Sequence, residues 1–541
     1  MLSTRADLAL ASQSLYTVSL YETLGPETTE YIINHAELSC IVTSLNHVPA
    51  LLKLAPRLSQ LKIIISVDSL DDGEVAGHTK ADLLGEMAKE NGIQLISLKQ
   101  VEEIGLASAR PMRPAARDDI ATINYTSGTT GAPKGVVLTH GNAVAAVSSG
   151  RTNGTIGHND VHMSYLPLAH IYGRMVDGIT LAVGGSIGFF HGDILTLVDD
   201  LKLLQPTGFI SVPRLYNRFN SAIQAATIEA DGVRGALSRH VVNTKKASMK
   251  QPPGKATNKH FLYDKIWTPK VKAAVGLQRV HSMISGSAQL DPDVQEFLRA
   301  AFANNFYQGY GLTETHAVGT VQTEGDFSTG NIGAPAGCAE ICLESVPEFE
   351  YTVDDKPNPR GELLIRGPCV FREYYKNPEE TQKTIEPDGW FHTGDIVEVD
   401  NLGRFKIIDR KKNVLKLAQG EYISPERIEN VYLGSTNLIS NAYVHGDPQE
   451  SALVGVFGID LEAFPPFASK VLGQSITAVD REALKKAINE PSVKAAFLKR
   501  LDEIARGHKF NSFERVKNVY LDIEPFTIEN ELLTPTYVSK L

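Results

Sequence analysis

The stretch Tyr125 to Gly135 reads Y-T-S-G-T-T-G-A-P-K-G. An apolar run, Ile120 to Ile123, precedes it and a valine-rich run, Val136 to Leu138, follows it, so we expect a polar loop between two strands. Glycines let backbone N–H groups approach an anion, hydroxyls add donors, and Lys134 adds a positive charge. The stretch therefore predicts a polyphosphate site. A flexible surface turn is the alternative, which the lysine and the flanking strands disfavour.

This loop differs from a Walker P-loop, in which Lys directly follows the last Gly, because here Lys134 precedes Gly135. It resembles instead the phosphate loop of the adenylate-forming enzymes, the superfamily of acyl-CoA synthetases, luciferases and peptide-synthetase adenylation domains. The resemblance requires the other family motifs to follow downstream, in order. It implies that ATP phosphates contact Thr126, Ser127, Gly128, Thr129, Thr130, Gly131 and Lys134.

A second motif, Tyr307 to Glu314, reads Y-Q-G-Y-G-L-T-E. The resemblance implies that the ring of Tyr310, next to Gly311, stacks on adenine. It also implies that Thr313 donates to the α-phosphate and that Glu314 holds Mg²⁺ through a hard carboxylate oxygen. Any one of these residues could be structural, but the whole motif after the phosphate loop is improbable by chance.

Two weaker motifs lie between the strong ones. Ile284 to Leu290 reads I-S-G-S-A-Q-L, and the resemblance places Gly286 and Ser287 against adenine and the acyl carbonyl. A plain strand-to-helix turn is an equally valid interpretation, since Asp and Pro follow as a helix start. The stretch P-L-A-H-I-Y-G-R contains His170, which the resemblance places at the acyl pocket, whereas a lone histidine in an apolar setting is more often a core residue.

Two further motifs lie later in the chain, at residues 389–396 and 407–423. In G-W-F-H-T-G-D-I, Asp395 matches the family carboxylate that accepts the ribose hydroxyls, with a turn-capping aspartate as the alternative. In I-I-D-R-K-K-N-V-L-K-L-A-Q-G-E-Y-I, Arg410 matches a residue that touches ribose or phosphate, and Lys412 or Asn413 is the expected hinge. Gly420 matches the loop that lines the pantetheine tunnel. A solvated basic face is the alternative for this stretch.

The early chain alternates helix and strand patterns, with strands expected at Cys40 to Thr43 and Lys62 to Val67, which indicates parallel βαβ units. We therefore predict an α/β fold with a large N-terminal domain of βαβ-type sheets with flanking helices, residues 1–410, and a small mobile α+β C-terminal domain, residues 411–541. The family usually has a longer segment before the stretch Val18 to Leu24, so the large domain is expected to lack it, either genuinely or through a shortened gene model.

Composition favours some classes of protein and argues against others. Of 541 residues, 42% are apolar and 21% charged, which is ordinary for a soluble globular protein. A formal net charge of −10 argues against a nucleic-acid binder, and an acidic enzyme handling ATP needs local basic residues and a divalent cation. Four cysteines indicate a reducing interior without a disulfide framework. No stretch reaches the roughly 18 to 20 apolar residues of a transmembrane helix.

The last three residues, Ser539, Lys540 and Leu541, match the peroxisomal address that the import receptor reads, so a peroxisomal location is expected. The motif wording resembles eukaryotic long-chain acyl-CoA synthetases and fungal peroxisomal acyl-CoA ligases. The resemblance implies an enzyme that uses ATP, Mg²⁺ and coenzyme A to convert a medium-chain, long-chain or secondary-metabolite carboxylic acid into a thioester through acyl-AMP.

One position departs from the family pattern. Thr534 to Tyr537 match the terminal motif, but Val538 stands where the family has the lysine that contacts the carboxylate and α-phosphate during adenylation. Two alternatives therefore stay open: an adenylating enzyme with another acceptor, or a catalytically impaired pseudo-enzyme.

Overall fold

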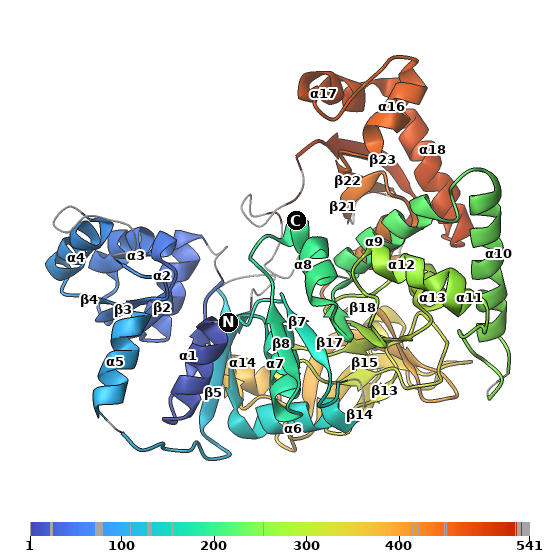
Figure 1. Cartoon of the computed structure of the whole chain (residues 1–541). Helices are drawn as coiled ribbons and strands as arrows, with labels where there is room; N and C mark the ends of the chain where they lie inside the picture. Colours follow the sequence, from blue (N-terminus) through green and yellow to red (C-terminus); the bar gives the residue numbers. More distant parts are fainter. Residues whose placement is uncertain are drawn as a thin grey trace. The chain divides into compact units, whose positions relative to one another are not determined.

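The computed structural model describes residues 2–21, 25–70, 79–108, 110–126, 132–152, 156–252, 254–413, 415–418, 421–447, 450, 452–524, 526 and 532. The chain forms two compact units. Figure 1 labels their helices and strands. The first unit contains residues 1–143, 168–171 and 371–378, and the second contains the remainder. The predicted domain boundary at residues 410 and 411 is a different division, and it stays a prediction.

The first unit has two small sheets. One has the order β1-β5-β6-β16, and β5 pairs with β6 in antiparallel register, so that Thr126 faces Lys134. The polar loop is thereby confirmed as a connection between two strands. The elements are α1 (Leu2–Ala11), β1 (Thr17–Ser19), α2 (Pro26–His35), β2 (Cys40–Thr43), α3 (Val48–Leu54), β3 (Ile63–Ser66), α4 (Lys80–Glu90), β4 (Gln94–Ser97), α5 (Leu98–Ser108), β5 (Ile120–Thr126), β6 (Lys134–Thr139) and β16 (Glu373–Tyr374).

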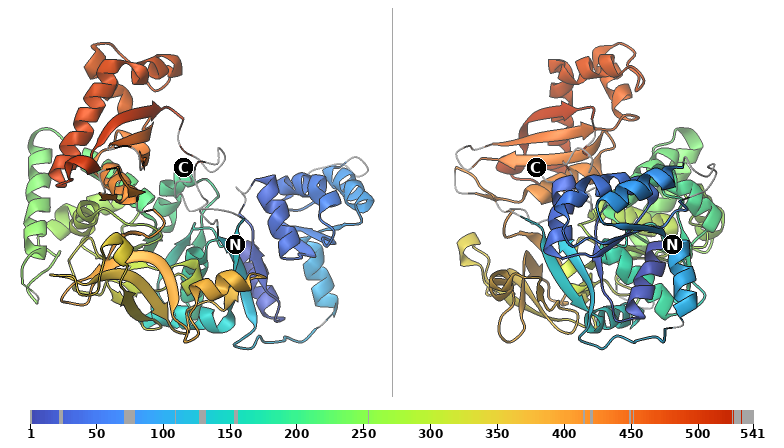
Figure 2. Two further views of the ribbon diagram at one scale, coloured as in Figure 1. Left: turned by 180° about the vertical axis from the view of Figure 1, so that it is seen from behind. Right: turned by 90° about the vertical axis from the view of Figure 1, so that its left-hand side faces the viewer.

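The second sheet of this unit is parallel, with the order β2-β3-β4. Apolar side chains of its strands pack with those of α2, α3 and α4, which surround it (Figure 2). β-branched residues dominate β3, which reads I-I-I-S, and they fit the pleated surface of a buried strand. The βαβ expectation for the early chain is confirmed.

The second unit is built on a seven-stranded sheet, order β13-β12-β11-β10-β9-β7-β8, whose β7 to β11 are parallel. An antiparallel sheet, order β14-β15-β17-β18, and a pair, β19-β20, follow. The elements before residue 411 are α6 (His140–Thr152, shared with the first unit), β7 (Val161–Ser164), α7 (Ile171–Ala182), β8 (Ser186–Phe189), α8 (Leu197–Leu204), β9 (Gly208–Ser211), α9 (Pro213–Ala226), α10 (Gly232–Met249), α11 (Tyr263–Ile266), α12 (Thr268–Ala274), β10 (Ser282–Ser285), α13 (Pro292–Phe302), β11 (Asn305–Tyr310), β12 (Thr320–Val321), β13 (Ala334–Pro335), β14 (Glu340–Glu344), β15 (Arg360–Arg366), α14 (Pro378–Thr384), β17 (Phe391–Val399) and β18 (Phe405–Arg410).

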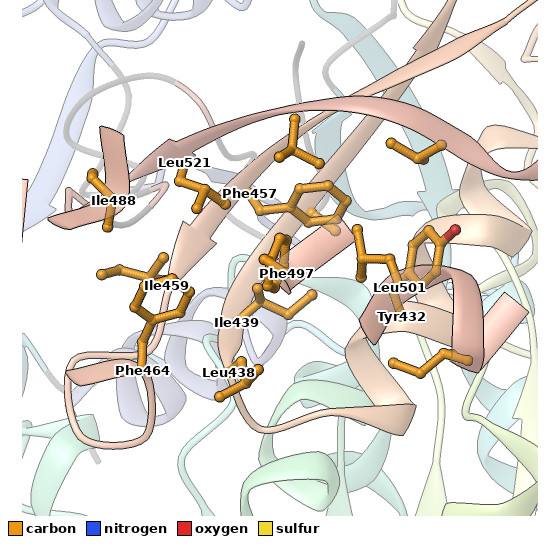
Figure 3. Packing of buried hydrophobic residues seen from close by; sticks show 14 of the residues in the cluster. Tyr432, Leu438, Ile439, Phe457, Ile459, Phe464, Ile488, Phe497, Leu501 and Leu521 are labelled. Carbon is orange, nitrogen blue, oxygen red and sulfur yellow. The ribbon is translucent and has the colours of Figure 1, made fainter. Parts of the chain in front are cut away.

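The C-terminal part of this unit has its own sheet, order β21-β22-β23, and its own core. Aromatic side chains meet there: Phe457 lies edge-on to Phe497 and to Tyr432 (Figure 3). No helix in the described part of the chain is both long enough and apolar enough to cross a bilayer. The elements are β19 (Leu415–Lys416), β20 (Tyr422–Ile423), α15 (Pro425–Ser435), β21 (Ile439–Gly446), β22 (Leu453–Ile459), α16 (Phe464–Leu472), α17 (Arg481–Asn489), α18 (Pro491–Gly507) and β23 (Val516–Asp522).

Glu429 of α15 makes the stability of this core depend on pH. Its Oε1 accepts the Val444 N–H at 2.7 Å, and burial raises the pKa of Glu429 to about 7. A carboxyl with a raised folded-state pKa loses its contribution to stability as pH rises through that pKa. We expect Glu429→Gln, which keeps the acceptor, to raise the free energy of unfolding by about 1 to 3 kcal/mol at about pH 8 and by less at about pH 5. Urea unfolding at both values measures this, with the exposed Glu503→Gln as control. An equal gain at both values would contradict the burial argument.

Candidate active site

A cleft opens beyond the carboxyl ends of β10 and β11, where open α/β sheets bind their ligands. Its empty volume is ≈ 600 Å³, open solvent at the mouth included, which is in the range of small-molecule sites. The lining residues are Ser287 to Gln289, Gly309 to Leu312, Ile332, Asp395, Ile407 to Arg410, Ser424, Glu426 and Arg427. Ser287, Tyr310, Gly311, Asp395 and Arg410, which the sequence predicts for the nucleotide, thus share one cleft.

Tyr310, Asp395 and Arg410 form a connected row in this cleft. The Tyr310 hydroxyl donates to Asp395 Oδ2 at 2.5 Å, and Arg410 Nε lies 3.4 Å from Asp395 Oδ1. The register of β17 against β18 places Asp395 opposite Arg410, while Tyr310 ends β11. Both Asp395 and Tyr310 are more than nine-tenths buried. The row fixes a flat ring, a carboxylate and a cation in one place, which are the groups that an adenosine nucleotide needs.

Burial is the largest cause of the raised pKa values of Asp395 and Tyr310. Burial raises the pKa of Asp395, and the Arg410 guanidinium opposes this shift. Asp395, in turn, raises the pKa of Arg410. Next to them, burial raises the pKa of Asp409 to about 7, and Asp409 Oδ1 accepts the Arg410 N–H. The Arg410 charge is therefore the feature that favours an ionised Asp395.

The turn after β10 shows why glycine stands at position 286. A Cβ there would lie 3.0 Å from Cζ of Tyr172 and 3.1 Å from its hydroxyl oxygen. The next residue, Ser287, has a φ of 74°, in the left-handed region that L-residues seldom adopt. The interpretation as a strand-to-helix turn is confirmed, because α13 begins shortly after it with Asp291 as its N-cap. The contact of Gly286 and Ser287 with adenine and the acyl carbonyl stays a prediction.

Gly311 supports the turn that carries Thr313 and Glu314. A Cβ at Gly311 would overlap the backbone C and O of Ala317, so Gly311→Ala must displace this turn. We expect the variant to lose about 10²-fold or more in adenylation rate, because displacing catalytic groups by about 1 Å costs that much. Gly309→Ala is a matched control two residues earlier, within β11, since the nearest atom to its Cβ would be 3.6 Å away. Pyrophosphate release measures both. Equal rates for the two variants would contradict the role given to this turn.

Thr313 and Glu314 lie in a short 3₁₀ turn, Thr313–Thr315, directly after the cleft residues Gly311 and Leu312. Neither side chain lines the cleft itself. Their predicted contacts with the α-phosphate and Mg²⁺ stay predictions.

Thr126, Lys134 and His170 belong to the first unit. Lys134 Nζ lies 5.2 Å from the ring centroid of Tyr374, and Thr126 and Lys134 close the β5-β6 hairpin. Burial lowers the pKa of His170 to about 4, so its imidazole is neutral near pH 7. The roles of these three residues in phosphate and acyl binding stay predictions.

Several predicted positions lie outside the described residues. They are Ser127, Gly128, Thr129, Thr130, Gly131, Gly420, Val538, Ser539, Lys540 and Leu541. Lys412, the predicted hinge, is exposed in the turn between β18 and β19, next to Asn413, whose N–H donates to Arg410 O.

Glu362 is a residue near the cleft that the sequence analysis missed. Its carboxylate is 5% exposed, accepts the Gly394 N–H at 3.1 Å and lies 3.4 Å from Lys411 Nζ. The backbone N–H of Lys411 in turn donates to Gly394 O at 2.7 Å. Glu362 thus connects Gly394 of β17, the residue before Asp395, to the residue that precedes the predicted hinge Lys412.

Within the part of the chain that the structure describes, one group of three possible metal ligands occurs: Glu344, Glu362 and His392. His392 Nδ1 lies 3.6 Å from both carboxylates, and its Nε2 lies 2.9 Å from Glu386 Oε1. These side chains satisfy one another, and the predicted Mg²⁺ ligand Glu314 is not among them.

Comparison with known proteins identifies the class. The family model described as "AMP-binding enzyme" matches residues 4–375, so the chain belongs to the AMP-binding enzyme family. The fold agrees: the adenylation domain of carboxylic acid reductase from Segniliparus rugosus, solved with AMP and a carboxylic acid, aligns with a TM-score of 0.77 at 24% identity, over 99% of this chain and 78% of that one.

Two curated relatives show which of the AMP-binding enzymes this chain is similar to. "Acyl-CoA ligase 891, peroxisomal" of Penicillium roqueforti is 57% identical over 98% of this chain and 75% of its own length. "Long chain acyl-CoA synthetase 7, peroxisomal" of Arabidopsis thaliana is 40% identical over 99% of this chain and 73% of its own length. Within the AMP-binding enzymes, the chain thus groups with acyl-CoA ligases and long-chain acyl-CoA synthetases, as the sequence resemblance implied.

Proposed function

We propose that this protein is an AMP-forming acid–thiol ligase that joins a carboxylic acid to coenzyme A at the expense of ATP. The observation that carries the proposal is the row Tyr310, Asp395 and Arg410, which brings together a ring, a carboxylate and a cation from three separate stretches of sequence. The motif order and the relatives at 57% and 40% identity support the same activity.

Different residues are proposed to bind different parts of the nucleotide. In the nucleotide cleft, the Tyr310 ring stacks on adenine and Asp395 accepts the ribose hydroxyls, while Arg410 holds the carboxylate in place. The loop from Thr126 to Lys134, together with Thr313, stabilises the phosphate charge. Positioning and electrostatics carry the reaction, and no side-chain nucleophile is needed.

The reaction has two steps. A carboxylate oxygen of the acid attacks the α-phosphorus, the bond to the bridging β-phosphate oxygen breaks, and pyrophosphate leaves. The thiolate sulfur of coenzyme A then attacks the acyl carbon, and AMP leaves with the electrons of the broken C–O bond. Between the steps the small domain rotates about Lys412, which brings Gly420 to the pantetheine tunnel.

Glu314 is the proposed magnesium ligand. Mg²⁺ prefers one or two protein carboxylates together with substrate phosphates, and a single glutamate beside a phosphate-binding threonine fits that preference. When bound, the ion supplies charge neutralisation on the phosphates. Thr126 and Lys134 supply the protein's own share of that charge.

The acid is proposed to be a medium-chain, long-chain or secondary-metabolite carboxylic acid, and His170 is proposed to border its pocket. The location is proposed to be the peroxisome, because Ser539, Lys540 and Leu541 form the import signal and two relatives are named peroxisomal.

The test is pyrophosphate and thioester formation with ATP, Mg²⁺ and a panel of fatty and aromatic acids, with and without coenzyme A. We expect one AMP and one acyl-CoA per pyrophosphate for at least one acid class. Adenylate formation without any thioester would replace the ligase by an adenylating enzyme with another acceptor. ATP binding without turnover for every acid would favour a pseudo-enzyme.

Val538 motivates both alternatives, because an apolar side chain at this position cannot stabilise negative charge on the α-phosphate. We expect Val538→Lys to accelerate adenylation, by up to about 10²-fold, and to accelerate the thioester step much less. Single-turnover measurement of acyl-AMP formation and of its conversion to acyl-CoA separates the two steps. Equal acceleration of both steps, or none, would show that position 538 does not take the place of the family lysine.

A further inference from the structure

The segment from residue 232 to 272 differs in charge from the rest of the chain. It contains ten Lys and Arg residues and a single acidic residue, Asp264, whereas the whole chain has a net charge of −10. The segment forms α10, α11 and α12 (Figure 1). Neither the nucleotide cleft nor the proposed reaction uses any residue of it.

Six of these ten basic side chains bond within the protein: Arg239, whose Nη1 donates to Ile228 O at 2.5 Å, and five lysines. Lys245 is fully buried and pairs with Asp264 at 2.5 Å. Lys246 and Lys250 both pair with Glu296 at 2.9 Å. The ammonium groups of Lys259 and Lys272 donate to backbone carbonyls. These six residues have a structural role.

Four others are exposed and form no ion pair with any described residue: Arg234, Lys255, Lys265 and Lys270. An acidic protein would normally keep such cations near its own carboxylates. Their concentration on one segment therefore indicates an external anionic partner.

Large apolar side chains accompany these cations. Val233 is 85% and Phe261 is 83% exposed, and Leu237, Leu262 and Ile266 are also exposed. Val233 and Leu237 are four residues apart on α10, and Leu262 and Ile266 are four apart along α11, so each pair lies on one helix face. Scattered single apolar residues need no explanation, but a group of this size marks an interaction surface.

Side-chain contacts join α10 to α11 and the residue that follows it. The indole N–H of Trp267, which follows α11, donates to Ser238 Oγ of α10 at 3.1 Å. The rings of His240 and Tyr263 lie edge to face with centroids 6.1 Å apart. Helices α10 and α11 therefore contact each other. Arg234 and Lys265 belong to these two helices, Lys255 to the connection between them and Lys270 to α12, which follows α11 directly.

We propose that the face formed by α10 and α11 docks on an anionic lipid surface. A bilayer interface satisfies both features at once, because lipid phosphates attract Lys and Arg while Phe and aliphatic side chains enter the acyl boundary. An acidic protein partner would match the charges but would not require a phenylalanine and a valine that are almost fully exposed. The inference is independent of catalysis, and it rests on the proposed function only in that apolar acids partition into membranes.

The test is co-sedimentation of the full chain with vesicles of phosphatidylcholine alone or of equal parts phosphatidylcholine and phosphatidylserine. We expect binding to the anionic vesicles that high salt reverses, and little binding to the neutral ones. The triple variant K255E/K265E/K270E should bind at least about tenfold more weakly, since each basic residue near such a surface contributes about 1 kcal/mol. The pair V233S/F261S should also bind more weakly.

Matched controls lie on the C-terminal helices. The triple variant K485E/K486E/K499E changes the same charge at exposed positions, and Val479→Ser removes an apolar side chain that is 92% exposed. Both should bind vesicles like the wild type, and all variants should retain the wild-type circular dichroism. Absence of anionic-vesicle binding, or equal losses for test and control variants, would overturn the proposal. Loss of binding in K255E/K265E/K270E with none in V233S/F261S would show that the cations alone bind the vesicles, and it would overturn the role given to the apolar side chains.

Discussion

Lys134→Met is expected to slow acyl-adenylate formation by about 10² to 10³-fold, the usual effect of removing one preorganised group that stabilises transition-state charge. The reason is the position of Lys134 at the end of the β5-β6 hairpin, where it borders the predicted phosphate loop. With Val538 at the position expected for the terminal family lysine, we expect Lys134 to stabilise more of that charge. Rapid-quench measurement of acyl-AMP, at saturating ATP and acid, gives the rate.

Lys376→Met is the matched control for this prediction. Lys376 Nζ lies 5.2 Å from the ring centroid of Tyr375, the same distance that separates Lys134 from Tyr374. Both lysines lose one cation–π contact on substitution, and Lys376 also loses its ion pair with Glu37, but only Lys134 borders the predicted phosphate loop. Equal rate losses in the two variants would show that the contact with the ring, and not phosphate binding, explains the effect.

Asp395→Asn is expected to raise the KM for ATP by about 10²-fold, because two hydrogen bonds from ribose to a charged acceptor are weakened. The kcat at saturating ATP should fall less. Asn keeps an oxygen for the Tyr310 hydroxyl, so the row of side chains should persist. Steady-state kinetics over a range of ATP concentrations measures both constants.

A nucleotide without the two ribose hydroxyls distinguishes a lost contact between Asp395 and ribose from a general disturbance of the fold by the substitution. The wild-type protein should use 2′,3′-dideoxy-ATP with a KM about 10²-fold above that for ATP, and Asp395→Asn should show almost no difference between the two nucleotides. Asp400→Asn, which removes a carboxylate that pairs with Arg404, should behave like the wild type. If Asp395→Asn still discriminated fully between the nucleotides, Asp395 would not be the ribose acceptor.

Local sequence signals predicted the elements of the fold well. The strand at Cys40 to Thr43 and the hairpin around the phosphate loop are confirmed, because β-branched runs bounded by turn residues specify strands over short distances. The helix start at Asp291 and Pro292 is also confirmed. The local signal there is the N-cap, because the Asp291 side chain accepts two backbone N–H groups.

Long-range partners could not be predicted in this way. Nothing near Gly286 indicates that the ring of Tyr172, over a hundred positions earlier, excludes a Cβ there. The hydrogen bond from Tyr310 to Asp395 likewise depends on how two sheets pack. The available signal for Glu362 was a charged residue inside the buried strand β15, and it gave no hint of Gly394 or Lys411 as partners.

The most direct test of the account follows oxygen from the acid. If a carboxylate oxygen attacks the α-phosphorus, an acid labelled with ¹⁸O in its carboxyl group must transfer one labelled oxygen to AMP, as mass spectrometry of the released nucleotide would detect. We expect labelled AMP in the presence of coenzyme A together with the acyl-CoA product. Unlabelled AMP, or label found in inorganic phosphate with ADP as product, would contradict an adenylating ligase.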